Sequence, residues 1–404
     1  LRLVRVVKRL WARWRAVQQV VMYPREPPLV EPPPVLFSNA SSTKWAQLDD
    51  VPARELAVCR FRTYPAVPKH LRARVAKALG DVLRRVADHQ VDLADPACSS
   101  VDVRERNRAL KWLLGFWQLF LRRVTTNRGR HRRPIERRLT QWENQEVGRL
   151  LAEWRADCAD QPLPEGRGPR SHEEQVRSAC ALIEEGEISR GVRFLHSLAQ
   201  GLGVVDLDED GVLEQLKRKH PARRRHVRPF AHYGVARGGA LEVNVVAKGR
   251  KLRRRVGVGP DGARNEHIRA ILASHGDVDA DAVGGLLSEF AGEWAGGVLP
   301  RWYYAQSLAA RVVALQKAKV GRRELKPVRP IGVGSAVSRL VGAAVVQHAV
   351  GVFRRLLCPI QVAVGVKGAA ELLVFGVRAL LHEHHAEAGA RKIDIVNAFN
   401  EFDR

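Results

Sequence analysis

The stretch VVALQKAKVGRRELKPVRPIGVGSAVSRLVG, residues 312–342, sets the expected architecture of the C-terminal part of the chain. Two short β-prone runs, residues 312–315 and 328–333, flank a polar turn that contains glycine and proline. Runs of this kind around a turn predict a β-hairpin. Apolar residues then recur over residues 335–357, which predicts a helix directly after the second strand.

Two cations lie on the arms of this hairpin. Lys317 follows the first strand, and Arg329 lies within the second. A compact ammonium and a forked guanidinium can jointly hold a triphosphate, because both donate charge-assisted hydrogen bonds to phosphate oxygens. The hairpin therefore predicts a phosphate-binding pair made of Lys317 and Arg329.

The composition of the whole chain also favours an anionic partner. Its 404 residues carry 68 basic and 43 acidic side chains, a net charge of +25, and 54 of the basic residues are arginine. This balance excludes an acidic solvating protein and favours a polyanion as partner. A second explanation is a G+C-rich genome, which raises arginine, alanine, glycine and valine together. The five cysteines are scattered without CxxC spacing, so we expect reduced thiols and an intracellular, nuclear or cytoplasmic protein that is not secreted.

Shifts in composition divide the chain into six expected segments. The first segment has an apolar stripe that would pack on its own domain, on RNA or on a membrane, and packing on the domain is the commonest case. The segments are a basic amphipathic helix (1–23), a proline-rich linker (24–54), a helical domain with an arginine-rich arm (55–160), a second linker (161–172), a helical basic segment (173–256) and the unit that contains the hairpin (257–404). Two capping-box patterns, at Thr140 with Glu143 and at Ser171 with Glu174, are expected to open helices.

Basic residues gather in three clusters along these segments. The first cluster is the arginine-rich arm, which is a candidate phosphate-binding loop. The clusters contain Arg122, Arg123, Arg128, Arg130, Arg132, Arg133, Arg137 and Arg138; then Lys217, Arg218, Lys219, Arg223, Arg224, Arg225 and Arg228; then Lys248, Arg250, Lys251, Arg253, Arg254 and Arg255. Repeated clusters suit a long phosphate backbone better than a small anion, although a solvated charge run explains each cluster equally well.

Several apparent motifs carry no chemistry. Residues 257–262 match GxGxxG, but Pro260 lacks an amide donor and no clean strand precedes it, so a reverse turn before a helix explains them. Residues 382–385, His-Glu-His-His, do not have the HExxH spacing of a zinc site and read as a helix end. The longest apolar run, residues 335–353, is interrupted by Arg339 and His348, so we expect no membrane partner.

The last residues, RKIDIVNAFNEFDR at 391–404, place a carboxylate inside an apolar β-prone run. A carboxylate at such a position is costly unless a cation accompanies it, and a metal ion would supply that cation. Asp394 is this residue, and Phe399 follows past the expected end of the strand.

The motif order "LQK…RPIGVGSAVSRLVG…QVAVGVKGAAE…KIDIVNAFNEFDR" resembles the first half of the reverse transcriptase domain of non-LTR retrotransposons and related RNA-directed DNA polymerases. Upstream, "GPDGARNEHIR" and Trp302 resemble the entry to the fingers of these enzymes. The resemblance covers about residues 257–404 and extends faintly to 171–220. It implies an α+β fold, with an α-rich N-terminal region followed by the fingers and the first palm strand of an incomplete right-hand polymerase.

The resemblance also assigns roles to individual residues. Asp394 becomes the first metal-binding aspartate, with the Ile395 carbonyl as a second ligand of Mg²⁺. Phe399 becomes the aromatic gate that excludes a 2′-hydroxyl, and Lys317 and Arg329 become the residues that hold the triphosphate of a dNTP. Gln316 stands where the family usually has proline, so Lys326 is an alternative to Lys317.

The expected activity is RNA-directed DNA synthesis, a nucleotidyl transfer with an RNA template, a DNA primer and dNTPs as partners. The sequence contains no Tyr-x-Asp-Asp motif, and one aspartate cannot hold two metal ions, so we expect a fragment that ends at motif A and is itself inactive. The alternative is a non-catalytic basic RNA-binding protein derived from a decayed or domesticated element. The oligomeric state stays open.

Overall fold

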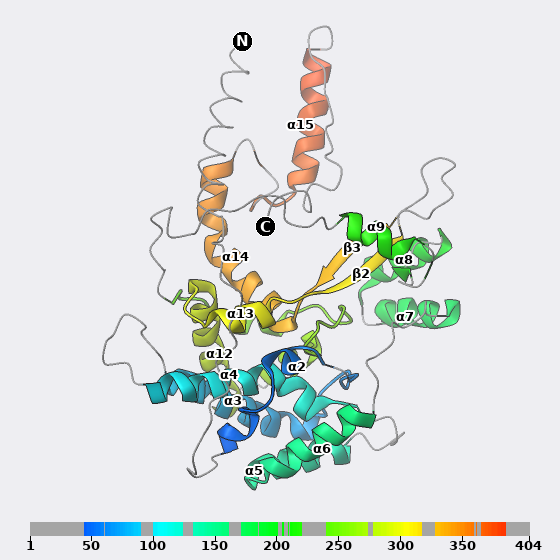
Figure 1. Cartoon of the computed structure of the whole chain (residues 1–404). Helices are drawn as coiled ribbons and strands as arrows, with labels where there is room; N and C mark the ends of the chain where they lie inside the picture. The colour runs from blue at the N-terminus through cyan, green and yellow to red at the C-terminus, as the bar shows by residue number, and fades with distance from the viewer. Residues whose placement is uncertain are drawn as a thin grey trace.

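The computed structural model describes residues 44–59, 61–89, 100–123, 132–160, 171–184, 186–200, 204–205, 209, 211–219, 240–273, 278–316, 328–358, 361 and 365–384. The described chain is mostly helical with one three-stranded antiparallel sheet, an α+β architecture (Figure 1). Its elements are η1 (Lys44–Leu48), α2 (Ala53–Ala57), η2 (Lys69–Leu71), α3 (Arg72–Asp88), α4 (Ser100–Leu121), α5 (Arg132–Glu143), α6 (Val147–Asp160), α7 (His172–Glu184), α8 (Ile188–Ala199), β1 (Val204–Val205), α9 (Val212–Lys219), α10 (Val246–Arg250), α11 (Asn265–Leu272), α12 (Val278–Gly296), α13 (Arg301–Ser307), β2 (Arg311–Gln316), β3 (Val328–Val333), α14 (Ala336–Leu357) and α15 (Ala369–Glu383).

One hydrophobic core joins helices that are far apart in the sequence. α12 packs along α3, and Gly80 permits this close approach because a Cβ there would lie only 2.9 Å from Val283 Cγ2. The core continues through α11 and α13 into the first turns of α14. Residues of the expected segments 55–160 and 257–404 therefore share a single core rather than forming separate ones.

The aromatic residues of α4 form the centre of this core. Trp112, Phe116 and Phe120 are buried, the Phe116 and Phe120 rings lie 4.8 Å apart, and Trp142 of α5 lies 5.2 Å from Trp112. From Leu110 to Leu121 the helix is apolar nearly all round and almost entirely buried, as is typical of a core helix. Residues 44–54, which the sequence places in the proline-rich linker, form η1 and the start of α2, and Leu48 is fully buried.

A buried ion pair ties α4 to α12. Arg106 Nη2 lies 2.9 Å from Glu293 Oε2, and only 3% of each side chain is exposed. A buried charge is costly unless it is paired, so the two residues hold each other in place. The pair therefore links the two helices inside the core.

The arginine-rich arm is only partly a surface feature. Arg122 and Arg138 are fully buried, and Arg122 Nε donates to Asp157 Oδ2 at 2.6 Å while Arg138 lies 3.5 Å from Glu153. Burial lowers the pKa of Arg138 to about 10. These two arginines therefore hold α6 against the end of α4, and the expectation that they bind phosphate is wrong for them.

The two expected capping boxes have different outcomes. Ser171 accepts a hydrogen bond from the Glu174 amide at 3.2 Å at the start of α7, as predicted. Thr140 opens no helix, because it lies inside α5, where its hydroxyl accepts a hydrogen bond from Arg74 Nη2. The chain turns after Glu143, and α6 starts at Val147.

The sheet has its own small core. The strand order is β1-β2-β3, and β2 pairs with β3 so that Leu315 faces Arg329 and Arg311 faces Val333, which confirms the predicted hairpin. β1, which the sequence did not predict, pairs with β2 through Val204 and Val205. The second core contains Val205, Val212, Leu216, Ala314 and Val328, all buried between the sheet and α9.

α14 and α15 project from the same side of the molecule (Figure 1). Within the described ranges, α14 is the helix that is long and apolar enough to cross a membrane, by length and composition alone. Its first half packs in the main core, where Leu340 and Ala344 are buried, whereas Phe353 and Leu356 in its second half are exposed. No described residue of α15 is buried.

Candidate nucleotide- and nucleic-acid-binding surface

Of the site residues expected from the sequence, Arg329 lies in the described structure. Lys317, Asp394, Ile395 and Phe399 lie outside the described residues. The expected juxtaposition of Lys317 and Arg329 with Asp394 is therefore neither shown nor excluded. Among the residues that the structure describes, no group of three or more His, Cys, Asp or Glu side chains is placed to hold a metal ion.

Arg329 lies on the outer face of the β2–β3 hairpin. Side chains alternate between the two faces of a sheet, and the neighbours Val328 and Pro330 share a face with the buried Ala314. Arg329 is exposed on the opposite face together with Ile331, which is 36% exposed. An exposed arginine can donate charge-assisted hydrogen bonds to a phosphate.

A second arginine marks the other end of this face. Arg311 pairs with Val333, two rungs beyond Val313 and Ile331, and it is also exposed. Arg311, Val313, Leu315, Arg329, Ile331 and Val333 therefore form one surface, which we call the outer sheet face. The outer sheet face carries two charged side chains, Arg311 and Arg329, and both are positive.

α9 fixes the hairpin through two side chains, of which Lys219 belongs to an expected charge cluster. Gln215 Oε1 accepts from the Val328 amide at 3.3 Å, and the Lys219 ammonium donates to the Val328 carbonyl. Lys219 is therefore used in structure, whereas Lys217 and Arg218 remain exposed. The Gln215 contact leaves no signal in the sequence, because more than a hundred residues separate the two partners.

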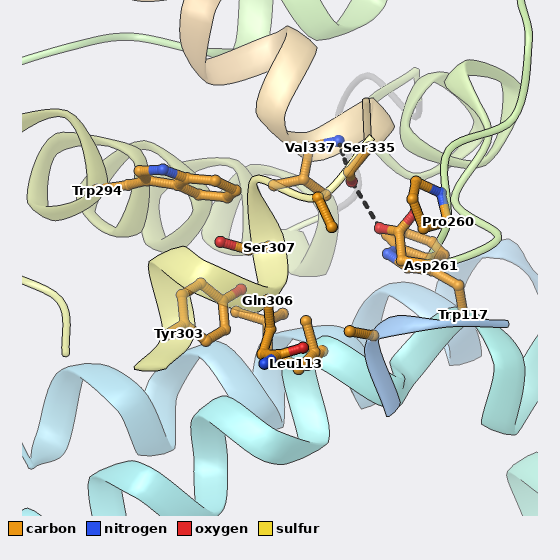
Figure 2. A pocket seen from close by; sticks show the side chains of 13 residues that line it. Leu113, Trp117, Pro260, Asp261, Trp294, Tyr303, Gln306, Ser307, Ser335 and Val337 are labelled. Atoms are coloured by element: carbon orange, nitrogen blue, oxygen red, sulfur yellow. Dashed lines mark hydrogen bonds between the residues drawn. The ribbon is translucent and has the colours of Figure 1, made fainter. Parts of the chain in front are cut away.

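The GPDGARNEHIR stretch forms a joint between α14 and the helical core. Ser335, the N-cap of α14, donates a hydrogen bond from its hydroxyl to Asp261 Oδ2 at 2.6 Å (Figure 2). The Ala263 amide donates to Asp261 Oδ1. Burial raises the pKa of Asp261, and the Ser335 hydrogen bond opposes that rise. Thr63 Oγ1 donates to the Gly262 carbonyl at 2.7 Å and so links the turn to the N-terminal helices.

His267 is the most enclosed polar residue of this joint. Its ring stacks on Trp117 with centroids 5.5 Å apart, Nε2 lies 2.7 Å from the Tyr64 carbonyl, and Nδ1 lies 3.3 Å from the Arg264 amide. A carbonyl can only accept, so Nε2 carries the proton and Nδ1 accepts from Arg264. Burial lowers the pKa of His267 to about 3, so the ring is neutral.

The cavity beneath the joint is too small for a nucleotide. It lies between Trp117, Asp261, Trp294, Tyr303 and the N-cap residue of α14 (Figure 2), and its volume is about 20 Å³. That volume is close to what one water molecule needs. The GPDGARNEHIR residues therefore position α14 against the helical core.

Comparisons with protein-family models, with curated proteins and with solved structures give no match.

Proposed function

We propose that this chain is the N-terminal part of an RNA-directed DNA polymerase of the non-LTR retrotransposon type. The observation that carries the proposal is the exposed Arg329 on the outer face of a hairpin that α14 follows directly, in the motif order of the resemblance. In this proposal Arg329 and Lys317 bind the triphosphate of the incoming dNTP. The exposed residues of the basic clusters bind the RNA template, and a DNA primer supplies the 3′-hydroxyl.

Asp394 and the Ile395 carbonyl are the proposed ligands of Mg²⁺, and Phe399 is the proposed gate against ribonucleotides. When bound, the metal ion would supply Lewis-acid activation of the primer hydroxyl. The residues of this chain bind and orient the nucleotide and the template. Because the sequence has no Tyr-x-Asp-Asp motif, we propose binding rather than polymerisation for these 404 residues alone.

Nucleotide binding by the full chain on an RNA–DNA primer-template tests the proposal. With Mg²⁺ present, Arg329→Gln should weaken dTTP binding roughly tenfold or more, because a charge-assisted hydrogen bond to phosphate contributes about 1.5–3 kcal/mol. Arg311→Gln is the matched control, since it removes the same charge from the same face. Equal losses in both variants, or no dTTP binding by the parent chain, would contradict the proposal.

A second candidate function is non-catalytic RNA binding. The exposed arginines at 253–255 and the lack of a Tyr-x-Asp-Asp motif favour it. It predicts tight RNA binding with no binding of dTTP. The same titration therefore separates the two functions.

A further inference from the structure

The loop at Leu252–Arg255 has an unusual backbone arrangement. Four consecutive carbonyls each accept a hydrogen bond from a side chain of another element. Arg269 donates to Leu252 at 2.7 Å, and Asn265 donates to Arg253 at 2.8 Å. Arg190 of α8 donates to the Arg254 and Arg255 carbonyls at 2.8 and 3.0 Å.

The end of the loop is held in a conformation that side chains rarely adopt. Arg255 has φ 53°, in the left-handed region, and its amide donates to Glu266 Oε1 at 2.6 Å. Such a conformation costs free energy and persists where the surroundings impose it. Here Arg190, which bonds the Arg255 carbonyl, and Glu266, which bonds the Arg255 amide, impose the left-handed conformation.

This arrangement turns the carbonyl oxygens toward the protein and leaves the arginine side chains outside. Arg253, Arg254 and Arg255 are all exposed, and in the described part of the chain Arg253 and Arg254 form no ion pair. Arg193 is exposed one turn after Arg190 on α8 and extends the positive surface. Arg253 and Arg254 thus present exposed guanidinium groups on a loop whose backbone acceptors are already used.

We infer that Arg253, Arg254 and Arg255, positioned by Arg190, bind the phosphate backbone of an RNA strand independently of its sequence. Guanidinium groups match phosphate geometry, and successive cations suit successive phosphates. Asn265, the amide side chain at the loop, is bonded to Arg253 and Arg339 and so is not free to read a base edge. The inference rests on the proposed function only for the choice of RNA.

The salt dependence of RNA binding tests the inference with the full chain. The probe is a fluorescein-labelled single-stranded RNA of mixed sequence, without nucleotide or Mg²⁺. Arg253→Gln/Arg254→Gln should weaken binding about tenfold at low salt. It should also reduce the slope of log K against log salt by about 1.4, because each phosphate contact on a single strand contributes about 0.7.

Two further variants separate specific contacts from general charge. The control variant Arg84→Gln/Arg149→Gln removes the same charge from exposed sites on α3 and α6. It should change RNA affinity by less than about twofold, because salt screens distant surface charges. Arg190→Lys keeps its charge but replaces the planar fork, whose two nitrogens each bond one carbonyl, with a single shorter donor atom, so it should weaken binding while the slope stays at the parent value.

The inference is overturned if the Arg253/Arg254 variant keeps the parent affinity and slope, or if the control variant loses as much. Parent-like binding by Arg190→Lys would overturn the positioning role of Arg190. Inorganic phosphate at matched ionic strength should not displace the RNA, and displacement would mean that a single phosphate is the ligand. Since dTTP is absent, failure here leaves the nucleotide-binding test of Arg329 unaffected.

Discussion

His267 shows how one buried side chain makes the stability of the fold depend on pH. Its pKa is about 3 in the folded chain, against 6.5 for an ordinary histidine. Below pH 6.5 the unfolded chain takes up a proton that the folded chain does not bind, so the free energy of unfolding falls as pH decreases toward 3. The slope of this fall is about 1.4 kcal/mol per pH unit.

We therefore expect His267→Gln to be less sensitive to acid than the parent chain, although it is less stable at pH 7. Between pH 7 and pH 5 the difference in unfolding free energy between the two proteins should shrink by about 2 kcal/mol. Urea denaturation at a series of pH values measures this difference, and groups common to both proteins cancel. A difference that stays constant with pH would show that the pKa of His267 is the same in the folded and unfolded chains.

Some side chains have partners on other helices that their local sequence does not indicate. Arg122 and Arg138 look like members of a solvated run, because their partners Glu153 and Asp157 lie on another helix. Thr140 matches a capping box, yet it lies inside α5, where its hydroxyl accepts a hydrogen bond from Arg74 of α3. Charge and short spacing are local properties, whereas burial depends on contacts between distant segments.

At the scale of elements, two turns of α12 make different demands on glycine. Gly292 contacts the segment that precedes α10. The Gly292 carbonyl accepts a hydrogen bond from the Leu241 amide at 3.0 Å. A Cβ atom on Gly292 would overlap the Leu241 carbonyl oxygen. Gly285, two turns earlier, is exposed, and nothing lies within 4 Å of a Cβ added to it.

Alanine at these two positions should therefore have opposite effects on stability. Gly285→Ala should stabilise the chain by about 0.5–1 kcal/mol, because alanine favours a helix over glycine. Gly292→Ala should destabilise it by about 1–3 kcal/mol, since the backbone of the Leu241 segment must move. Thermal denaturation of both variants tests this, and a stabilised Gly292→Ala would show that the segment does not pack on α12.

Helices and the hairpin were the parts that the sequence predicted best. α14 has a long apolar pattern, α11 follows a reverse turn, and β2 and β3 flank a clear turn, so local sequence signals are sufficient to find them. β1 has two residues, too few for an alternating pattern. For the candidate site, the sequence predicted Arg329 on an arm of the hairpin, but the Arg190 contact joins residues too far apart to leave a signal.

At the scale of the whole molecule, the two cores differ greatly in size. The main core joins α3, α4, α11 and α12, whereas the core under the sheet contains Val205, Val212, Leu216, Ala314 and Val328. Stability follows buried apolar area, so the sheet with α9 should open more readily than the helical core. The surface that carries Arg329 therefore belongs to the less stable part of the fold.

Hydrogen exchange measures this difference directly. Amides of β2 and β3 should exchange faster than those of the central turns of α4, with protection that differs by roughly tenfold or more. Exchange followed by mass spectrometry on the full chain reports both regions in one experiment. Equal protection would show that the two cores unfold as one cooperative unit.

The bonds around Val328 have a consequence for how this protein meets other chains. β3 is the outermost strand, and outward-pointing backbone groups invite another strand to pair. Gln215 and Lys219 already occupy both polar groups of Val328, and Pro330, which points the same way, has no N–H to offer. The part of this edge at Val328 therefore offers a neighbouring strand no free backbone group, so strand addition beside Val328 is disfavoured.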